Sequence, residues 1–519
     1  MIPPADSASH DAVVGLLRIA PVTDELADRF AAAGHVLYLV GGSVRDALLG
    51  RLPSGGHRPD LDFTTDARPE QTQAILTGWA DAVWDTGIAF GTVGAAKAGT
   101  TYEVTTYRAE RYDRVSRNPE VVFGDSLHDD LLRRDFTINA MAVQLPVRDL
   151  LAGSSRGGRD LLAGSSRGGR DLLAGSSRGG RDPGQWGRRF VDPYGGRAAL
   201  ARRELDTPAP PQESFADDPL RMLRAARFVS QLGFTLAPRV HTAIADMAGE
   251  IRRIAAERVQ AELSKLLLGP HPRRGVELMV DTGLAEQVLP EVPAMRLEID
   301  EHHQHKDVYT HSLTVLDQAV ALEREEPDLV LRLAALLHDI GKPATRRHEP
   351  GGGVSFHHHE AVGAKMARAR LRALRYSNDI VSDVAQLVFL HLRFHGYGRG
   401  EWTDSAVRRY VADAGDLLPR LHQLVRADCT TRNRRKAAAL QRSYDDLEAR
   451  IERIRTEEDL ARVRPDLDGN AIMELLGIPP GPLVGQAWRF LKELRLDRGP
   501  LTRDEAEAEL LRWWATVRK

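Results

Sequence analysis

Apolar and polar residues alternate over short distances in the first part of the chain and follow helical spacing over most of the remainder. Short apolar or alternating runs predict strands at residues 35–40, 61–64, 102–107 and 136–147. A helix is predicted at residues 43–49, directly after the first strand. From Pro211 to Lys519 the helical spacing continues almost without a break and is interrupted by turn sequences. The pattern predicts an α+β protein, with a small α/β head followed by a long all-α neck and body.

An internal repeat interrupts the predicted head. The unit RDLLAGSSRGG occurs three times without change from Arg148 to Gly180, and Arg181-Asp182 begin a fourth copy. Solenoid repeats are about 20 residues or longer and vary in sequence, because each unit builds a structural layer. This short, identical unit is rich in Gly, Ser and Arg, which is typical of a flexible insertion. We therefore expect a surface loop within the head.

These changes of pattern predict five regions. They are an N-terminal helical extension at 1–34, the head at 35–207 with the repeat insertion at 148–182, a helical neck at 208–300, a histidine-rich body at 301–430 and a helical tail at 431–519.

Composition excludes several classes of protein. The 519 residues carry 71 Lys and Arg against 73 Asp and Glu, so bulk positive charge does not drive binding to nucleic acid. The single cysteine, Cys429, excludes an internal disulfide and a cysteine-based zinc cluster. No apolar run reaches the roughly 18 residues of a membrane-spanning helix, and the first residues lack the pattern of a signal peptide. We expect a soluble, reduced, cytoplasmic protein that does not enter a membrane.

The predicted head contains a glycine turn typical of phosphate binding. Gly41-Gly42-Ser43-Val44-Arg45 follows the first strand and opens a helix. Glycines let a phosphate approach the backbone, and the helix N-terminus and the Arg45 guanidinium attract it. An ordinary turn has the same sequence, so this motif alone leaves both interpretations open.

Two carboxylates follow on the next predicted strand. Asp60 and Asp62 are two residues apart, which places both on one face of a strand. Like charges this close repel unless a divalent cation lies between them, and Mg²⁺ prefers such oxygen ligands and also holds substrate phosphates. A solvated strand edge is the alternative. Glu103 on a neighbouring strand is either a third carboxylate of this site or part of a structural ion pair.

A predicted neck helix combines one carboxylate with three arginines. Asp218, Arg221, Arg224 and Arg227 recur every three residues and form a ridge, with Asp217 or Asp218 as N-cap and Pro219 as first helical residue. The ridge is either an exposed helix face or a base-recognition surface. Cytosine and adenine each present an amine beside an unprotonated ring nitrogen, so a carboxylate and a guanidinium together select C and A without a template.

The motif order resembles a known family. GGSVRD, DLD, RRDFTINAM, VDPYGG and DDPLRMLRAARF occur between about residues 35 and 270, as in class II tRNA nucleotidyltransferases and bacterial poly(A) polymerases, which have a polymerase-beta-like head. The resemblance implies that Asp60 and Asp62 bind catalytic Mg²⁺. It implies nucleotide contacts for the following residues: Gly42, Arg45, Arg134, Asp218, Arg221, Arg224 and Arg227. Asp217 departs from the family, which usually has Glu there.

Histidines and aspartates gather in the body. His338 and Asp339 are adjacent within an apolar helix, where an unpartnered carboxylate is costly to bury. Imidazoles with carboxylates suit a transition metal better than Mg²⁺. Residues 305–430 resemble the HD phosphohydrolase superfamily. The resemblance implies His311, His338, Asp339 and Asp428 as metal ligands, with His359 and His391 available to a second metal.

The hypothesis from these residues is template-independent addition of CCA to the 3′ end of tRNA from CTP and ATP, with release of pyrophosphate. A poly(A) polymerase, or an enzyme that adds only CC or only A, has the same motifs. A third alternative makes the HD region the working part, a metal-dependent phosphohydrolase with the head as an RNA-binding module. The sequence does not indicate the oligomeric state.

Overall fold

The computed structural model describes residues 22–51, 61–85, 91–108, 123–145, 189–296, 300–301, 304–305, 307–350, 353–394, 397, 402–431, 433–458 and 465–518. Asp60 and the repeat insertion lie outside this part of the chain. The chain divides into two compact units, the first formed by residues 1–229 and 233–250 and the second by residues 230–232 and 251–519. Each unit is described by itself.

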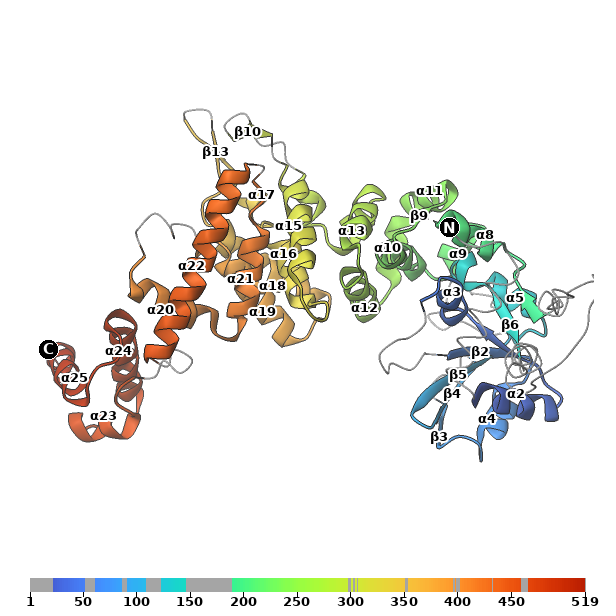
Figure 1. Cartoon of the computed structure of the whole chain (residues 1–519), viewed down its shortest axis with the longest axis horizontal. Coiled ribbons are helices and arrows are strands. Elements are labelled where there is room, and N and C mark those ends of the chain that lie inside the picture. Colours follow the sequence, from blue (N-terminus) through green and yellow to red (C-terminus); the bar gives the residue numbers. More distant parts are fainter. Residues whose placement is uncertain are drawn as a thin grey trace, which may run out of the picture. The chain divides into compact units, whose positions relative to one another are not determined.

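A seven-stranded sheet forms the centre of the first unit, with the order β3-β4-β5-β2-β1-β6-β7 (Figure 1). The strands are β1 Leu37–Val40, β2 Leu61–Thr65, β3 Ala82–Trp84, β4 Thr92–Lys97, β5 Thr100–Thr106, β6 Ala142–Gln144 and β7 Phe190–Val191. All neighbours are antiparallel except β2 and β5, which are parallel. Along β2 and β5 buried residues such as Phe63 and Val104 alternate with more exposed ones such as Asp62 and Glu103. This period of two fixes which side chains face the core.

Helices accompany this sheet and follow it in the chain. They are α2 Val22–Ala32, α3 Gly42–Leu48, α4 Pro69–Leu76, α5 Leu127–Leu132, α8 Gly196–Arg202, α9 Pro211–Asp217, α10 Leu220–Leu232 and α11 Pro238–Met247, with the short pair β8 Glu204–Leu205 and β9 Thr235–Leu236. The turn between β1 and α3 is made by Gly41, whose φ of 78° is accessible to glycine at little cost.

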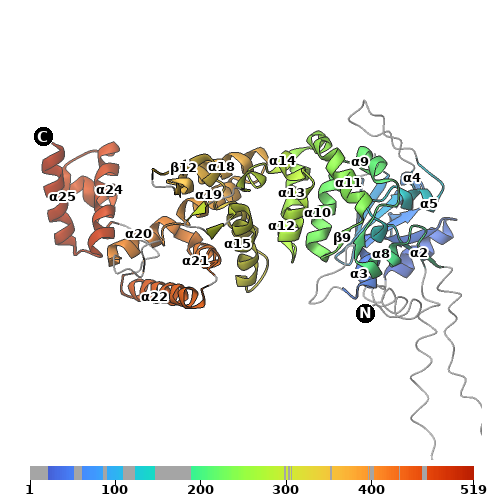
Figure 2. The same ribbon diagram turned by 90° about the horizontal axis from the view of Figure 1, so that it is seen from above.

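The second unit is almost entirely helical (Figure 2). Its longer helices are α12 Ala256–Leu267, α13 Pro272–Asp281, α15 Val308–Leu322, α16 Leu329–Leu337, α18 His359–Ala373, α19 Asn378–Leu390, α20 Asp404–Ala414, α21 Leu418–Ala427, α22 Arg434–Glu458, α23 Gly469–Leu476, α24 Pro482–Arg498 and α25 Arg503–Val517. Shorter elements are α14 Leu284–Val288, α17 Lys342–Thr345 and two hairpins, β10 Asp300–Glu301 with β11 Gln304–His305 and β12 Arg347–His348 with β13 Val354–Ser355.

Two groups of helices make up most of this unit. α15 and α16 pack against each other and against α21, and α16 also packs against α19, which lies along α18. At the C-terminal end α23, α24 and α25 enclose a small core of Leu467, Ile472, Leu491 and Leu510. Among the described helices, none combines the length and the apolar character needed to cross a bilayer.

The structure confirms the predicted architecture and corrects two local predictions. The strand predicted at residues 136–147 is wrong at its start, because Thr137–Asn139 form a 3₁₀ turn before β6. Asp135 stabilises this turn by accepting hydrogen bonds from the Phe136 backbone N–H (2.8 Å) and the Asn139 amide (2.9 Å).

The start of α10 also differs from the prediction. Asp217 ends α9, and Pro219 rather than an aspartate occupies the N-cap of α10. Asp218 therefore precedes the helix that carries the three arginines, although its Oδ1 still accepts a hydrogen bond from the Leu220 N–H at 3.2 Å.

Candidate functional site

The glycine turn, Asp62 and Arg134 converge at one end of β1 and β2. Any side chain in place of the Gly41 hydrogen would have its Cβ 3.3 Å from Arg134 Nη1 and 3.4 Å from Asp62 Oδ2. Both polar side chains therefore lie against the backbone of the turn, within reach of the same bound group. The structure therefore brings the glycine turn, Asp62 and Arg134 together.

Arg134 is held from behind by a buried carboxylate. Its Nη2 donates to Asp130 Oδ2 at 3.3 Å, and Arg133 Nη2 donates to the other oxygen at 2.7 Å. Burial alone would raise the pKa of Asp130, but the two arginines outweigh it and lower the pKa. Asp130 therefore stays charged and keeps Arg134 oriented. Arg134 Nε is buried and has no hydrogen-bond partner among the described residues.

The carboxylate side of the site contains two acids in register. Asp62 lies opposite Val40 of β1 and beside Glu103 of β5. Because paired residues of neighbouring strands point to the same face, Asp62 and Glu103 share a face that is at least partly exposed. Glu103 is thus placed where a third carboxylate would stand. The position of Asp60 relative to these acids stays a prediction.

A chain of hydrogen bonds joins the glycine turn to α10. Arg45 Nη1 donates to Asn139 Oδ1 at 2.8 Å, and the Asn139 amide donates to Asp135 Oδ1 at 2.9 Å. Arg224 Nε and Nη2 donate to Asp135 Oδ2 at 2.9 and 2.5 Å. Arg45 is also paired with Asp46 through two hydrogen bonds of 2.8 and 2.7 Å. The link runs through the 3₁₀ turn that replaces the predicted strand.

Asp135 is the centre of this chain. Burial would raise its pKa, but Arg224, Asn139 and Arg221 outweigh burial and hold the pKa well below its usual range. A charged, hydrogen-bonded carboxylate fixes the Arg224 guanidinium in one position. Asp135 and Asn139 stand in the RRDFTINAM motif, but no pattern in the sequence indicated that they connect Arg45 to Arg224.

Three guanidinium groups surround one aromatic ring. The guanidinium carbons of Arg227, Arg45 and Arg224 lie 4.2, 5.2 and 5.8 Å from the centre of the Phe228 ring. Phe228 itself is fixed by an edge contact with Phe136 at 5.5 Å. Cation–π attraction lets these like charges stand close together, so the ring helps to gather three guanidinium groups. No pattern in the sequence singled out Phe228.

Arg221 has a role inside the protein. Only 9 % of it is exposed, and it donates to Ser214 Oγ at 2.9 Å and to the Arg133 carbonyl oxygen at 2.6 Å. These bonds tie α10 to α9 and to the loop that carries Arg134. Recognition of a base by Asp218 and Arg221 stays a prediction.

A second cluster lies in the helical unit, at the ends of several helices. His338 and Asp339 follow α16, His391 follows α19, Asp428 follows α21, and His359 begins α18. His311, on α15, lies with His338 and Asp428 in one group of candidate metal ligands, and Asp339, His359 and His391 form another. The structure therefore brings together all six residues implied by the HD resemblance.

Asp339 lies between the two groups. Its Oδ2 is 3.2 Å from His338 Nε2 and 3.5 Å from His311 Nε2, and its Oδ1 is 3.3 Å from His359 Nε2 and 3.9 Å from His391 Nε2. Each carboxylate oxygen thus faces a different pair of imidazoles, so Asp339 could contribute a ligand to either group.

The imidazoles are oriented by bonds on their far side. Nδ1 of His338, His359 and His391 bonds to the carbonyl oxygen three residues earlier, at 2.9, 2.8 and 2.6 Å, and His311 Nδ1 bonds to Thr430 Oγ1 at 3.1 Å. This arrangement presents every Nε2 to the centre and is typical of histidine metal ligands. Nε2 of His359 and His391 is buried and has no hydrogen-bond partner among the described residues. The donors therefore fit a metal ion.

The electrostatics of this cluster are those of crowded, buried groups. Burial lowers the pKa of His391 to about 4, with a further contribution from His338. Burial acts in the same direction on His338, but Asp339 and Asp428 outweigh it and raise its pKa to about 9. Metal ions would satisfy the carboxylates and the neutral imidazoles together.

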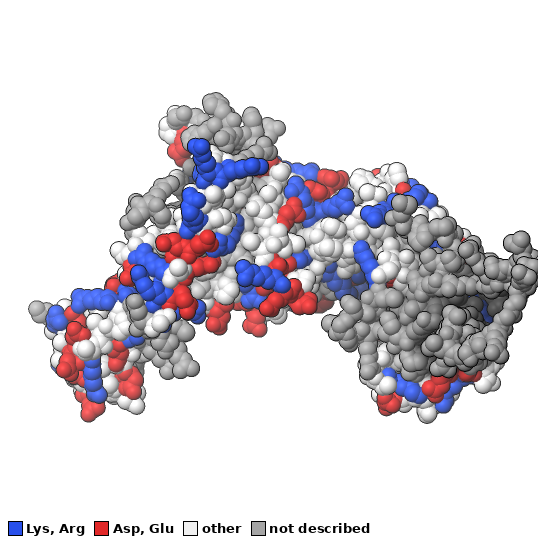
Figure 3. Space-filling view, in the orientation of Figure 1, with Lys and Arg blue, Asp and Glu red and all other residues white. Residues whose placement is uncertain are grey.

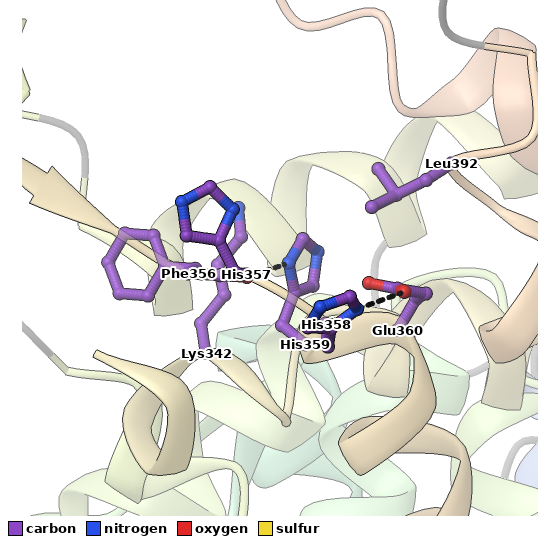
Figure 4. Close-up of a pocket in the computed structure, with 7 residues that line it drawn as sticks. All are labelled: Lys342, Phe356, His357, His358, His359, Glu360 and Leu392. Atoms are coloured by element: carbon purple, nitrogen blue, oxygen red, sulfur yellow. Dashed lines mark hydrogen bonds and ion pairs between the residues drawn. The ribbon is translucent and has the colours of Figure 1, made fainter. Parts of the chain in front are cut away.

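A pocket opens beside this cluster (Figure 4). It has a volume of about 380 Å³ and is lined by Lys342, Phe356, His357, His358, His359, Glu360 and Leu392. Lys342 Nζ lies 2.8 Å from Asp339 Oδ2, so a side chain that lines the pocket also pairs with the central carboxylate of the cluster. The size and the lining suit a small anionic ligand.

Comparisons with known proteins find three family matches along the chain. Residues 37–166 match the family described as poly A polymerase head domain, residues 233–295 match a probable RNA and SrmB-binding site of polymerase A, and residues 308–433 match the HD domain. The exact domain boundaries predicted from the sequence stay predictions.

Similar proteins cover almost the whole chain. An A-adding tRNA nucleotidyltransferase of Deinococcus radiodurans is 32 % identical over 92 % of this chain and 95 % of its own length. A CCA-adding enzyme of Anoxybacillus flavithermus is 30 % identical over 93 % of each. The crystal structure of the Bacillus stearothermophilus CCA-adding enzyme in complex with CTP superposes with a TM-score of 0.63 at 25 % identity, covering 96 % of this chain and 99 % of that one. The chain belongs to the tRNA nucleotidyltransferases that carry a poly A polymerase head domain.

Proposed function

We propose that this protein adds C, C and A, in that order of position, to the 3′ end of tRNA from CTP and ATP. The observation that carries the proposal is the match along nearly the full length of relatives named for this class of reaction. The convergence of the glycine turn, Asp62 and Arg134 supports it, because one small region then offers groups for both phosphate and metal.

In the proposed reaction the 3′ hydroxyl of tRNA attacks the α-phosphate of the nucleotide, and pyrophosphate leaves. Asp60 and Asp62 would hold Mg²⁺, which supplies charge neutralisation at the phosphates and favours ionisation of the attacking hydroxyl. Glu103 stands in register with Asp62 and is available to the same ion. Backbone N–H groups at Gly42 and the Arg45 and Arg134 guanidinium groups bind the phosphates and orient them.

Selection of the base is assigned to the start of α10. Asp218 accepts from the exocyclic amine of C or A, and Arg221 donates to the neighbouring ring nitrogen, with Arg224 and Arg227 as further nucleotide contacts. The hydrogen bonds from Arg45 through Asn139 and Asp135 to Arg224 support this assignment, since they hold the phosphate-binding turn and α10 in a fixed relation. Uracil and guanine would leave unpaired groups, at about 1–3 kcal/mol each.

The experiment offers each nucleotide separately to tRNA that ends at the base before C, after one C, or after two C. Full CCA activity predicts CTP incorporation into the first two substrates and ATP incorporation into the third. ATP use alone would replace the proposal by A addition, CTP use alone by CC addition, and long A runs on all three by poly(A) synthesis.

A second activity is favoured by the HD cluster. We propose that its six converging donors hold one or two transition-metal ions, with Asp339 between them, and that the centre hydrolyses phosphoesters. Such a centre supplies metal-activated water, and Lys342 is placed to hold the negative charge of the substrate. The test is metal content together with hydrolysis of a phosphodiester probe, bis(p-nitrophenyl) phosphate, by the full chain loaded with Mn²⁺, Co²⁺ or Ni²⁺. A metal-loaded protein without hydrolysis would leave only a structural centre.

A further inference from the structure

The helix α22 carries its charges in the order that opposes its own dipole. Its first nine residues, 434–442, hold four basic side chains and no acidic one, whereas 445–458 hold six acidic and three basic residues. Basic side chains at a helix N-terminus and acidic ones at the C-terminus both weaken a helix. Other helices of this unit, such as α19, α20 and α25, have acidic residues in the first turn. The reversed order in α22 therefore needs a reason outside helix stability.

The four basic side chains form a patch, here called the α22 patch, made of Arg434, Arg435, Lys436 and Arg442. All four are exposed. Among the described residues none of them has a hydrogen bond or an ion pair from its side chain, whereas Arg450, farther along the helix, is paired with Asp404 at 2.6 Å. Figure 3 shows Lys and Arg side chains over the upper end of α22 and acidic side chains farther down the helix. The patch is thus a concentration of positive charge that the described residues do not neutralise.

Two arginines of the α22 patch lie on the same side of the helix. Arg435 and Arg442 are seven residues apart, so they lie about 20° apart around the helix and about 10 Å apart along it. Tyr444, Leu447 and Ile451 form the opposite, buried face. The residues between the two arginines include three alanines and no large exposed apolar side chain. This surface lacks the apolar anchors of a protein interface, but two cations in line suit successive phosphates of a nucleic-acid backbone.

The patch begins a few residues after the HD cluster. Asp428 is one of the candidate ligands, and Thr430 bonds to His311 Nδ1 at 3.1 Å. Asn433 then caps α22, its Oδ1 accepting from the backbone N–H groups of Arg435 and Lys436 at 3.0 and 3.1 Å. The segment that completes the cluster therefore leads directly into the positive end of α22.

We propose that the α22 patch binds the phosphate backbone of RNA and holds an RNA strand beside the HD cluster. The choice of RNA as the partner rests on the proposed function of the chain. The binding itself is electrostatic and independent of sequence, so it depends strongly on salt concentration.

The test measures the affinity of the full chain for unmodified tRNA at several salt concentrations. The variant carries Arg435→Glu and Arg442→Glu, and the control is Arg455→Glu, an exposed arginine in the acidic half of the same helix. We expect about tenfold weaker binding for the double variant near 0.1 M salt and a salt slope smaller by roughly 1.4 to 1.8, which corresponds to two lost phosphate contacts. The control should bind within about twofold of the parent.

Thermal unfolding of the same proteins separates binding from folding. Glutamate in place of Arg435, in the first turn of α22, favours the helix dipole, and Arg442 is exposed in the third turn. The double variant should therefore unfold at the same temperature as the parent or higher while it loses RNA affinity. Unchanged tRNA affinity in the double variant, an equal loss in Arg455→Glu, or no tRNA binding by the parent would each overturn the proposal. Nucleotide addition is scored separately. A parent that adds no nucleotides but loses affinity on substitution would refute the proposed function and leave the patch in place.

Discussion

The head site and the HD cluster differ in how their charged side chains are paired. In the head, Arg45 is paired with Asp46, Arg134 with Asp130 and Arg224 with Asp135. In the HD cluster, four imidazoles and two carboxylates point at one another, and the outer nitrogens of the imidazoles are fixed by carbonyl and hydroxyl groups. The head therefore holds its cations ready for an anionic substrate, whereas the HD cluster is arranged around cations that the side chains do not supply.

The two sites also differ in exposure. Asp62 and Glu103 lie on a partly exposed face of the sheet, while His338, Asp339 and His391 are each only 1 % exposed. A substrate as large as the end of an RNA can approach an exposed face of the sheet directly. A pocket of about 380 Å³ opens beside the HD cluster, and His359 is the cluster residue that lines it.

The largest effect is expected in the head. Asp62→Ala removes a proposed metal ligand and should lower nucleotide incorporation by about a hundred- to a thousandfold, since removal of one essential charge-stabilising group has effects of this size. The thermal unfolding temperature should change little, because Asp62 is partly exposed on β2. Radiolabelled CTP and ATP incorporation gives the measurement. Incorporation within tenfold of the parent would remove Asp62 from the site.

A matched change in the HD cluster should leave nucleotide addition intact. Asp339→Asn keeps the size of the side chain but removes the charge that faces both groups of imidazoles. We expect loss of bound transition metal by about a hundredfold or more in affinity, measured by titration calorimetry. Nucleotide incorporation should stay within about twofold of the parent. Equal metal affinity in parent and variant would show that Asp339 does not hold the metal.

The link between the glycine turn and α10 can be broken at Asp135. Asp135→Asn removes the charge that fixes Arg224, and we expect kcat/KM for both nucleotides to fall about 10- to 100-fold. Removal of one member of a buried pair also destabilises the fold, by about 3 kcal/mol. Asp206→Asn, which removes the 2.7 Å pair with the half-exposed Arg239, is the control and should have a much smaller effect on both quantities.

The pH dependence of stability shows whether the lost charge of Asp135 causes the destabilisation of Asp135→Asn. The pKa of Asp135 is lowered in the folded protein, so its stabilising contribution is complete above the unfolded-state pKa near 3.8 and is lost as pH falls through the folded-state pKa. The difference in unfolding free energy between the parent and Asp135→Asn should therefore be constant from pH 5 to 7 and shrink below about pH 4. A difference that persists unchanged in acid would point to packing rather than charge.

The smallest effect concerns the glycine turn. Gly41→Ala adds a methyl group 3.3 Å from Arg134 and 3.4 Å from Asp62 at a position with φ of 78°, and we expect about tenfold lower incorporation. Gly50→Ala is the matched control, because Gly50 has φ of 70° but no atom within 4 Å of the added methyl group. Both variants should lose about 1 kcal/mol of stability, and only Gly41→Ala should lose activity. Equal activities would show that the close approach at Gly41 is unimportant.

The contrast also explains which features could be predicted from the sequence. The strands at Leu37–Val40 and Leu61–Thr65 and the helix after Gly41 follow from local alternation and turn residues. The turn at Thr137–Asn139 does not, because Phe136 and Ile138 alternate with polar residues as in a strand, and side-chain bonds to Asp135 decide the conformation.

At both sites, the contacts that could not be predicted from the sequence depend on how distant parts of the chain meet in the fold. Arg45 and Asn139 are 94 residues apart, and nothing local indicates that they bond. The HD ligands could be grouped by motif, but the orientation of each ring depends on the carbonyl groups at the ends of α16 and α19, which only the folded chain positions. The contact of the Phe228 ring with three arginines could likewise not be predicted, because α10 and α3 are far apart in the sequence and meet only in the folded chain.

Extension of the 3′ end of tRNA by a fixed, short sequence is the activity on which every other role proposed for the head depends. The most direct measurement is the length and sequence of the product made from tRNA lacking its last three nucleotides when CTP and ATP are supplied together. We predict that growth stops after three residues and that these read CCA. No extension, or a run of A that continues to lengthen with time, would contradict this prediction.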